Sequence, residues 1–329
     1  MLLDQSASDH RPPLAEPVDF LVDGAIVRGT FYSPQSGGRP WPVVVVAHGW
    51  GMVSGGDLEE YAASFVGAGF AALTFDFRNL GASDGEPRQE IDPHRQIEDF
   101  RGAISYVRSR NDVDSERIGL WGSSYSGGHA LVVAAIDRRV KCVVAQVPTI
   151  SGWKAARQRT SAKDLQAQQR WFEEDREERF RGEQAQTIPM ISPDPNAAVA
   201  YPGADSYEYM GGQAEICGNW KNEVTVRSLE LARSYEPGAY ITRIAPTPLL
   251  MIVADSDVTT PANLQQEAYQ RAHHPKRLLL VPGGHYSVYT DHFAQTRQAA
   301  TDWFSQHLSG PTPLWTDSAS TLTAERPVR

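Results

Sequence analysis

The sequence predicts an α/β fold: a mostly parallel, doubly wound sheet with a helical lid inserted after the sixth strand. Residues 43–47 form a continuous, mostly β-branched apolar run, which is typical of a strand buried on both faces of a parallel sheet. The segments 140–147 and 248–254 are also mainly apolar and are expected to be buried strands of the same sheet. These runs alternate with segments of helical periodicity, which is the order that β-α-β units require. The alternation stops between 149 and 240, so we expect the lid there.

Composition narrows the class of protein. The chain has 329 residues, enough for one large α/β domain with an insertion, and 41% of them are hydrophobic, as in ordinary globular proteins. A net charge of −9 argues against a nucleic-acid partner and an anionic membrane surface. We see no basic-then-apolar leader and no apolar run of ~18 residues, so we expect a soluble cytoplasmic protein that does not associate with membranes.

The expected domain boundaries follow changes in composition. Residues 1–17 are polar and proline-containing and are expected to form an N-terminal arm. The α/β core comprises 18–148 and 241–308, and the lid comprises 149–240. Residues 309–329 contain Pro, Thr and Ser with little periodicity. They are expected to be a C-terminal tail, which could dock on a second subunit of a homo-oligomer.

The core begins with a hairpin and a helix. Residues 18–32 alternate apolar and polar positions, as in two strands that turn near Asp23 and Gly24. After the buried strand that follows, residues 57–69 are expected to form a helix. Asp57 can cap it, and its apolar residues share one face (Leu58, Tyr61, Ala62 and Phe65).

The next elements lead to the centre of the sheet. Residues 71–77 are expected to form a strand, followed by the polar, glycine-punctuated loop 76–85. In this loop we expect Asp76 and Arg78 to brace the backbone rather than do chemistry. Residues 93–108 are expected to form an amphipathic helix, because one stripe of it is apolar (Ile97, Phe100, Ile104 and Val107).

Beyond the lid the alternation resumes. The buried run 248–254 is followed by a helix that ends at Ala272 and by a strand at 276–281. Residues 291–308 are the expected final helix, with four large apolar residues for packing (Phe293, Trp303, Phe304 and Leu308).

A tight turn between an expected strand and an expected helix is the main candidate for chemistry. The apolar run 118–121 changes abruptly into residues that are small except for Tyr125, from Gly122 to Gly128, and a helix follows at 129–136. Such a turn can hold a serine in a strained conformation, with its hydroxyl presented to a pocket above the sheet. Ser124 has a glycine two residues before it, as the G-x-S-x-G pattern requires, so we predict that Ser124 is a nucleophile.

Two neighbouring serines compete for this role. Neither Ser123 nor Ser126 has a glycine two residues before it, which favours Ser124. Ser126 stands where the pattern has its second glycine. Because serine is small and Gly127 and Gly128 follow, the turn remains feasible.

A serine hydroxyl is a weak nucleophile at neutral pH, so it needs a base within reach and a third group that holds the base. Asp257 and His285 each follow an expected strand, and parallel strands place these ends on one edge of the sheet. Two glycines before His285 would let its loop approach the serine. We therefore expect His285 to be the base and Asp257 to orient it.

Rival residues are weighed by their position in the chain. Asp255 is the alternative acid. We favour Asp257 because Pro261, four residues later, starts the next helix, and such loops usually carry their acid at that offset. Among the other candidate bases, His129 lies on the helix after the turn, His273 and His274 precede a strand, and His292 lies beyond the loop of His285. Each of them is expected to be a surface or packing residue.

A second glycine-rich turn follows the first buried strand. Here Trp50 is preceded by His48 and Gly49 and followed by another glycine, which permits a sharp turn with exposed amides. The backbone N–H groups of Trp50 and Tyr125 are the expected oxyanion donors. The imidazole of His48 is expected to pin the loop through a hydrogen bond.

The lid carries aromatic residues scattered among charged and Pro/Gly segments. They could form the roof of a pocket for an apolar or aromatic substrate, and our candidates for lining it are Trp153, Tyr207, Tyr209 and Trp220. No cluster of His, Cys and carboxylate residues has the spacing of metal ligands, so we expect neither a metal nor another cofactor.

The chain resembles the α/β-hydrolase superfamily from about residue 18 to 308. Its turn at 122–127 is similar to the G-x-S-Y-x-G elbow of the X-Pro dipeptidyl-peptidase and cocaine-esterase branch. The segments 48–51, 76–85 and 283–285 are similar to segments of the polyketide-transferase and dienelactone-hydrolase-like groups. This resemblance implies acyl transfer from an ester, lactone or thioester through an acyl-serine.

The favoured interpretation is a serine hydrolase without a cofactor that cleaves a small-molecule ester or lactone, on an apolar, aromatic or polyketide-type substrate. One alternative is an acyltransferase that passes the acyl group to an alcohol, because exclusion of water depends on lid geometry. The other alternative is a non-catalytic ligand-binding protein of the same fold.

Overall fold

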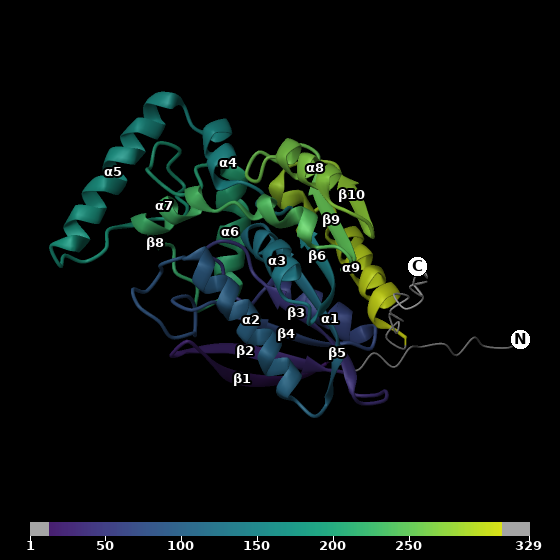
Figure 1. The fold of residues 1–329 in the computed structure, drawn as a ribbon. Coiled ribbons are helices and arrows are strands. Elements are labelled where there is room, and N and C mark those ends of the chain that lie inside the picture. Colours follow the sequence, from purple (N-terminus) through teal and green to yellow (C-terminus); the bar gives the residue numbers. More distant parts are fainter. Residues whose placement is uncertain (1–12, 311–329) are drawn as a thin grey trace, which may run out of the picture.

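The computed structural model describes residues 13–310 and contains an eight-stranded sheet with helices on both faces (Figure 1). The strands of this sheet are β1 (Leu14–Val22), β2 (Ala25–Ser33), β3 (Trp41–Ala47), β4 (Ala71–Phe75), β5 (Val113–Ser123), β6 (Val140–Gln146), β9 (Leu249–Ala254) and β10 (Lys276–Val281). Their order is β1-β2-β4-β3-β5-β6-β9-β10. β1 and β2 run antiparallel to their neighbours and the other adjacent pairs are parallel, so the predicted α/β class with a mostly parallel sheet is confirmed.

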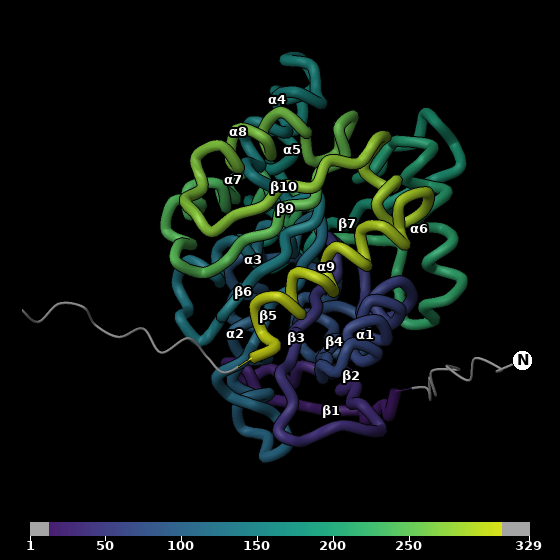
Figure 2. Tube along the Cα trace, turned by 90° about the vertical axis from the view of Figure 1, so that its right-hand side faces the viewer, coloured from purple at the N-terminus to yellow at the C-terminus, as the bar shows by residue number. Residues whose placement is uncertain are grey.

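Helices cover both faces of the sheet. α1 (Asp57–Gly67) and α9 (Phe293–Leu308) lie on one face, and in Figure 2 α9 crosses in front of the sheet beside α1. α2 (Pro93–Ser109), α3 (Tyr125–Ile136) and α8 (Ala262–Arg271) lie on the other face. Each of the helices expected in the core therefore forms, with ends within a few residues of the predicted ones.

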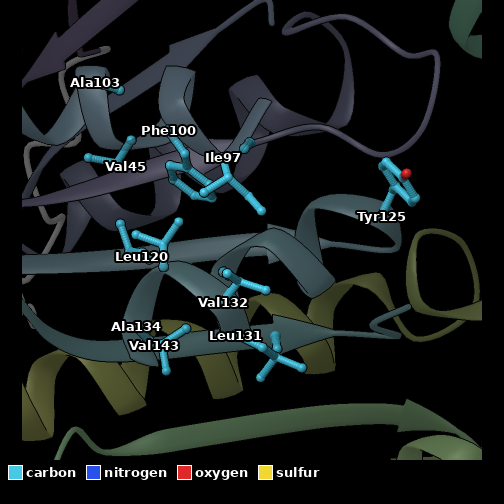
Figure 3. Packing of buried hydrophobic residues seen from close by; sticks show 14 of the residues in the cluster. Val45, Ile97, Phe100, Ala103, Leu120, Tyr125, Leu131, Val132, Ala134 and Val143 are labelled. Carbon is cyan, nitrogen blue, oxygen red and sulfur yellow. The ribbon is translucent and has the colours of Figure 1, made fainter. Parts of the chain in front are cut away.

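The strand β3 shows why a continuous apolar run is needed at the centre of the sheet. Val43 and Val45 belong to the hydrophobic cluster under α2 and α3, whereas Val44 and Val46 belong to the cluster under α1 and α9. All four side chains are fully buried, because side chains alternate along a strand and both faces are covered. Figure 3 shows part of the first cluster, where strand residues meet residues of α2 and α3 (Val45, Leu120, Val143, Ile97, Phe100, Leu131 and Val132).

We call residues 149–240, between β6 and β9, the insertion. Its elements are α4 (Gly152–Arg159), α5 (Ala162–Phe180), β7 (Thr187–Ile188), α6 (Ala204–Ile216), β8 (Val224–Thr225), α7 (Val226–Ser234) and most of the 3₁₀ helix η1 (Pro237–Arg243). β7 and β8 pair as a separate antiparallel sheet. α5 extends away from the main sheet (Figure 1). Within residues 13–310, no helix is both long enough and apolar enough to cross a bilayer.

One predicted boundary needs correction. β1 begins at Leu14, so residues 14–17 belong to the sheet and not to the N-terminal arm. These four residues are exposed and give no alternating pattern, whereas burial alternates only from Val18. Pairing with β2, opposite Thr30 to Ser33, places them in the sheet. The rest of the arm up to residue 12, and the tail from residue 311, lie outside the described residues.

The loop after β4 is held by a buried ion pair. A guanidinium nitrogen of Arg78 lies 2.6 Å from a carboxylate oxygen of Asp99, and the Asp99 side chain is fully buried. The backbone N–H of Arg78 donates to the other oxygen of Asp99 at 3.0 Å. Asp76 accepts hydrogen bonds from the amides of Ser54 and Ala82. The predicted bracing role of Asp76 and Arg78 is therefore confirmed.

We expect Asp99→Ala to lower the free energy of unfolding by about 3–5 kcal/mol, because it leaves the buried guanidinium of Arg78 without its partner. Urea unfolding followed by circular dichroism would measure the loss. Asp23→Ala is the matched control, because Asp23 is exposed and 3.9 Å from the same guanidinium. Its loss should stay below about 1 kcal/mol. Equal losses in the two variants would contradict the prediction.

Candidate active site

The candidate site lies where the chain changes direction across the sheet. From β3 the chain passes to β4 on one side and later to β5 on the other, so the carboxyl ends of β3 and β5 flank a switch point. Crevices at such points are the usual ligand sites of open α/β sheets. Ser124 directly follows β5, and Gly49 follows β3. Asp257 and His285 follow β9 and β10.

Ser124 has the strained backbone expected of a nucleophile on a tight turn. Its φ is 58° and its ψ is −114°, a region that residues other than glycine rarely adopt. The turn requires Gly122, because a Cβ there would lie 2.2 Å from the carbonyl oxygen of Ser126. The N–H of Ser124 donates to the carbonyl of Gln146 in β6 at 2.9 Å, which ties the turn to the sheet.

The two competing serines make other contacts. The hydroxyl of Ser126 donates to the carbonyl of Ala47 at the end of β3, at 2.6 Å, and accepts from the N–H of Ser123 at 2.9 Å. A serine in place of the second glycine thus fastens the turn to β3. The hydroxyl of Ser123 lies 2.5 Å from that of Tyr289. Of the three serines, Ser124 is the one whose hydroxyl lies within hydrogen-bonding distance of His285.

The structure brings the three predicted residues together. The Oγ of Ser124 lies 3.1 Å from Nε2 of His285, and Nδ1 of the same ring lies 2.8 Å from Oδ2 of Asp257. All three side chains are at least nine-tenths buried. The Nδ1–H of His285 can therefore donate to the carboxylate of Asp257, which leaves Nε2 free to accept the proton of Ser124.

Asp257 is held as a carboxylate. Burial by itself raises its pKa, but the nearby His285 and the hydrogen bonds from His285 and Thr260 outweigh burial and lower the pKa below the ordinary value. Its Oδ1 accepts from the amides of Thr259 and Thr260 at 2.8 and 2.9 Å. The Thr260 hydroxyl lies 2.8 Å from Oδ2 and 3.2 Å from Nδ1 of His285. Sequence reasoning missed Thr260, although a hydroxyl three residues after the acid was a usable signal.

Asp255, the rival acid, has a different partner. Its side chain accepts from the N–H of Gly283 at 3.1 Å and from the hydroxyl of Ser256 at 2.8 Å. It therefore joins the loop after β9 to the loop that carries His285, and Asp257 is the acid in contact with the imidazole.

The other candidate histidines make no hydrogen bond to Ser124 in the described part of the chain. His129 is fully buried on α3, with Nδ1 2.8 Å from the hydroxyl of Tyr235 and Nε2 3.0 Å from Oε1 of Gln96. His273 and His274 are exposed before β10, and His292 precedes α9. His48 donates from Nδ1 to the carbonyl of Gly49 at 2.9 Å and accepts at Nε2 from the N–H of Phe77 at 3.3 Å, so it pins its loop as predicted.

His129 should make stability depend on pH. Burial, and then the charges of His48 and His94, lower the pKa of His129 from 6.5 to about 3. Between these values the unfolded chain binds a proton that the folded protein excludes, so stability decreases as the pH falls below 6.5. We expect His129→Gln, which can still form hydrogen bonds, to reduce this slope by up to about 1.4 kcal/mol per pH unit. Urea unfolding from neutral pH to about pH 4 would test this; parallel curves for the two proteins would contradict it.

The two expected oxyanion donors flank Ser124. A Cβ on Gly49 would lie 3.4 Å from the Cβ of Ser124, so the turn after β3 approaches the serine closely. Among residues 13–310, no hydrogen-bond acceptor is found for the backbone N–H of Trp50 or of Tyr125. Both residues line the same cavity as Ser124. Two unsatisfied amides beside a serine hydroxyl are able to bind a negatively charged oxygen.

Two cavities meet at Ser124. The larger has a volume of about 920 Å³ and lies between the strand ends and the insertion. The smaller, of about 50 Å³, lies between η2 (His285–Val288), α6 and the start of α1. Tyr201 lines both cavities, and its ring packs edge-on against Trp50 with centroids 5.6 Å apart.

The structure corrects most of the predicted pocket residues. Tyr209 lines the smaller cavity. Trp153 and Tyr207 point to solvent, with exposed fractions of 58% and 42%. The indole N–H of Trp220 donates to the carbonyl of Gly51 at 2.9 Å, so this residue braces the turn after β3. The aromatics that do line the larger cavity are Trp171, Phe172 and Tyr201. In a segment without clear periodicity, the sequence gives no sign of which aromatic residues face inward.

No group of three or more His, Cys, Asp or Glu side chains within residues 13–310 is arranged to hold a metal ion. The groups that lie together at the site are the hydroxyl of Ser124, the imidazole of His285, the carboxylate of Asp257 and nearby backbone amides.

The strand order, the strained serine after β5 and the histidine beside it are those of an α/β hydrolase. The chain belongs to the X-Pro dipeptidyl-peptidase family (S15 family), whose profile matches residues 23–287. The protein is accordingly a serine hydrolase of the α/β fold.

Several known proteins resemble this chain in sequence or in structure. The chain is 32% identical to the thiohydrolase aneE of Aspergillus aculeatus, over 82% of this chain and 86% of aneE. It is 31% identical to the quorum-quenching protein AidA of Acinetobacter baumannii, over 75% of this chain and 80% of AidA. The crystal structure of the α/β hydrolase GrgF from a Penicillium species matches with a TM-score of 0.77 and 26% identity, over 90% of this chain and 100% of GrgF.

Proposed function

We propose that the protein hydrolyses a small-molecule carboxylic ester or lactone through an acyl-serine intermediate. The observation that carries this proposal is the hydrogen-bonded series from Asp257 through His285 to Ser124, beside a large cavity. In the first half-reaction the Oγ of Ser124 attacks the carbonyl carbon while Nε2 of His285 takes its proton. His285 then gives this proton to the leaving oxygen as the bond to that oxygen breaks.

The second half-reaction uses the same groups. Water attacks the acyl carbon, its proton passes to His285, and Ser124 recovers a proton as the acid departs. Asp257 keeps the imidazole in the required tautomer and stabilises the imidazolium. The amides of Trp50 and Tyr125 bind the oxyanion that forms in each half-reaction.

The acyl part of the substrate is proposed to be apolar or aromatic. Trp171, Phe172 and Tyr201 of the insertion form part of the wall of the larger cavity, which supports a substrate with apolar area to bury. In this proposal the insertion acts as the lid over the strand ends. The name of the relative aneE extends the candidate substrates to thioesters.

Transfer of the acyl group to an alcohol is the second candidate. It is favoured by the names of two relatives, the polyketide transferase grgF and the acyltransferase drtE, which are 27% and 29% identical to this chain. A non-catalytic ligand-binding protein is less well supported, because the nucleophile, base and acid are all present and in contact.

Labelling and product analysis would test the proposal. A fluorophosphonate probe is expected to label Ser124, as located by peptide mass spectrometry. Methyl esters, lactones and thioesters of graded acyl length should then be supplied with and without added alcohols, and the free acid and new ester measured. Free acid as the main product supports the hydrolase, whereas ester as the main product supports the transferase. An unlabelled Ser124 and no product from any substrate would leave the ligand-binding alternative.

A further inference from the structure

The two cavities at Ser124 differ in whether His285 forms part of their wall. Both are lined by Ser124, Trp50 and Tyr201, so the acyl carbon of a substrate would lie where they meet. His285 lines the smaller cavity and is not part of the wall of the larger one. Tyr125, whose backbone N–H is a proposed oxyanion donor, lines the larger cavity.

The proton transfers of the proposed reaction assign a role to the smaller cavity, which His285 lines. When the acyl-enzyme forms, the bond from the carbonyl carbon to the leaving oxygen breaks, and that oxygen must take a proton from Nε2 of His285. When the acyl-enzyme is hydrolysed, the attacking water must give a proton to the same nitrogen. The leaving group and the water therefore occupy the same place at different times, and this place must be beside His285.

We propose that the smaller cavity is the site of the leaving group and of the attacking water, and that the larger cavity holds the acyl part. This inference rests on the proposed function. The smaller cavity has a volume of about 50 Å³ against about 920 Å³ for the larger one, so it offers room for water or a small alcohol and far less room for a bulky group. The site therefore selects small alcohols as leaving groups and as acyl acceptors, which favours hydrolysis.

The smaller cavity is walled by residues that hold one another in place. The hydroxyl of Tyr209 on α6 donates to Asp57 at the start of α1 at 2.8 Å, and the amide of Gln213 donates to the same carboxylate at 3.0 Å. The ring of Tyr209 stacks on Tyr289, with centroids 4.9 Å apart. These contacts fasten α6 of the insertion to the core, so the walls resist the widening that a bulky group would need.

Met210 provides a way to enlarge this cavity. Its side chain is buried on α6 and lines the smaller cavity. Met210→Ala removes part of the wall and leaves Ser124, His285 and Asp257 intact. Leu229→Ala is the matched control, because Leu229 lines only the larger of the two cavities. Met52→Ala is a second enlarging variant at a half-buried residue, in case Met210→Ala fails to fold.

The test compares methyl and benzyl esters of one acyl group. Methanol and benzyl alcohol have similar acidities. A difference in kcat/KM between the two esters therefore reports how well the alcohol fits the smaller cavity, and not how readily it leaves. We expect the wild-type protein to prefer the methyl ester by about tenfold or more. Met210→Ala or Met52→Ala should reduce this ratio, whereas Leu229→Ala should leave the ratio unchanged and alter the dependence on acyl length.

A second measurement compares how readily two alcohols accept the acyl group from the acyl-enzyme. With equal concentrations of methanol and benzyl alcohol present, the wild-type protein should form methyl ester and little benzyl ester, and the enlarging variants should form more benzyl ester. Equal use of the two esters and the two alcohols by the wild-type protein would overturn the inference while leaving ester hydrolysis intact. No labelling of Ser124 and no acid from any substrate would instead overturn the proposed function, and the inference with it.

Discussion

Ser124→Ala should fold normally and lower kcat for ester hydrolysis by about three or more orders of magnitude. The variant lacks the oxygen that would become acylated, and the proton acceptor at Nε2 of His285, 3.1 Å away in the native protein, then has no donor. What activity remains would come from attack by water, helped only by the oxyanion amides. Initial rates of acid release at saturating substrate, with thermal unfolding to verify the fold, would measure the effect.

Ser123→Ala is the matched control for this variant. It removes a neighbouring hydroxyl that contacts Tyr289 and not His285. We expect its kcat to stay within about tenfold of the native value, because it makes no contact with the imidazole. Full activity in Ser124→Ala would refute the assignment of the nucleophile, and loss of activity confined to Ser123→Ala would reassign it.

Asp257→Asn should lower kcat by about three to four orders of magnitude with little change in KM. The Asn amide can donate to Nδ1 of His285, which favours the tautomer with its proton on Nε2. This nitrogen is then unable to accept the proton of Ser124. Phosphonylation of Ser124 by the fluorophosphonate probe, in which fluoride is displaced, should slow in parallel with kcat, because both depend on the base.

Asp255→Asn is the control for the acid. Asp255 contacts the N–H of Gly283, not the imidazole, so its replacement should disturb the loop and not the tautomer of His285. We expect a loss of kcat below about tenfold. A larger loss in Asp255→Asn than in Asp257→Asn would contradict the geometry of the site.

Local patterns in the sequence predicted much of this protein. The apolar run at 43–47 predicted a strand covered on both faces, because an unbroken apolar run is stable only where both sides exclude water. The small residues around Ser124 predicted a tight turn, and the structure gives the steric reason at Gly122. The position of Asp257 and His285 after strands predicted that they would meet, because parallel strands end on one edge.

Other features depended on contacts between distant segments. The strand residues 14–17 are stabilised by pairing with β2 and carry no pattern of burial. Spacing alone favoured Asp257 over Asp255 as the expected acid. The contacts that distinguish the two come from the structure, in which Asp257 lies 2.8 Å from His285 and Asp255 accepts from the N–H of Gly283. Tyr201 lines both cavities and Trp153 lies in solvent, although both are aromatic residues of the insertion.

The sequence by itself determined the fold class and the residues that meet at the strand ends, because strand burial and turn sterics are local properties. Only the tertiary structure decided which insertion residues line the two cavities. It also decided that His285 lines the smaller cavity and not the larger one. The shape of a cavity arises from the packing of segments far apart in the chain, and neither composition nor spacing encodes how those segments face one another.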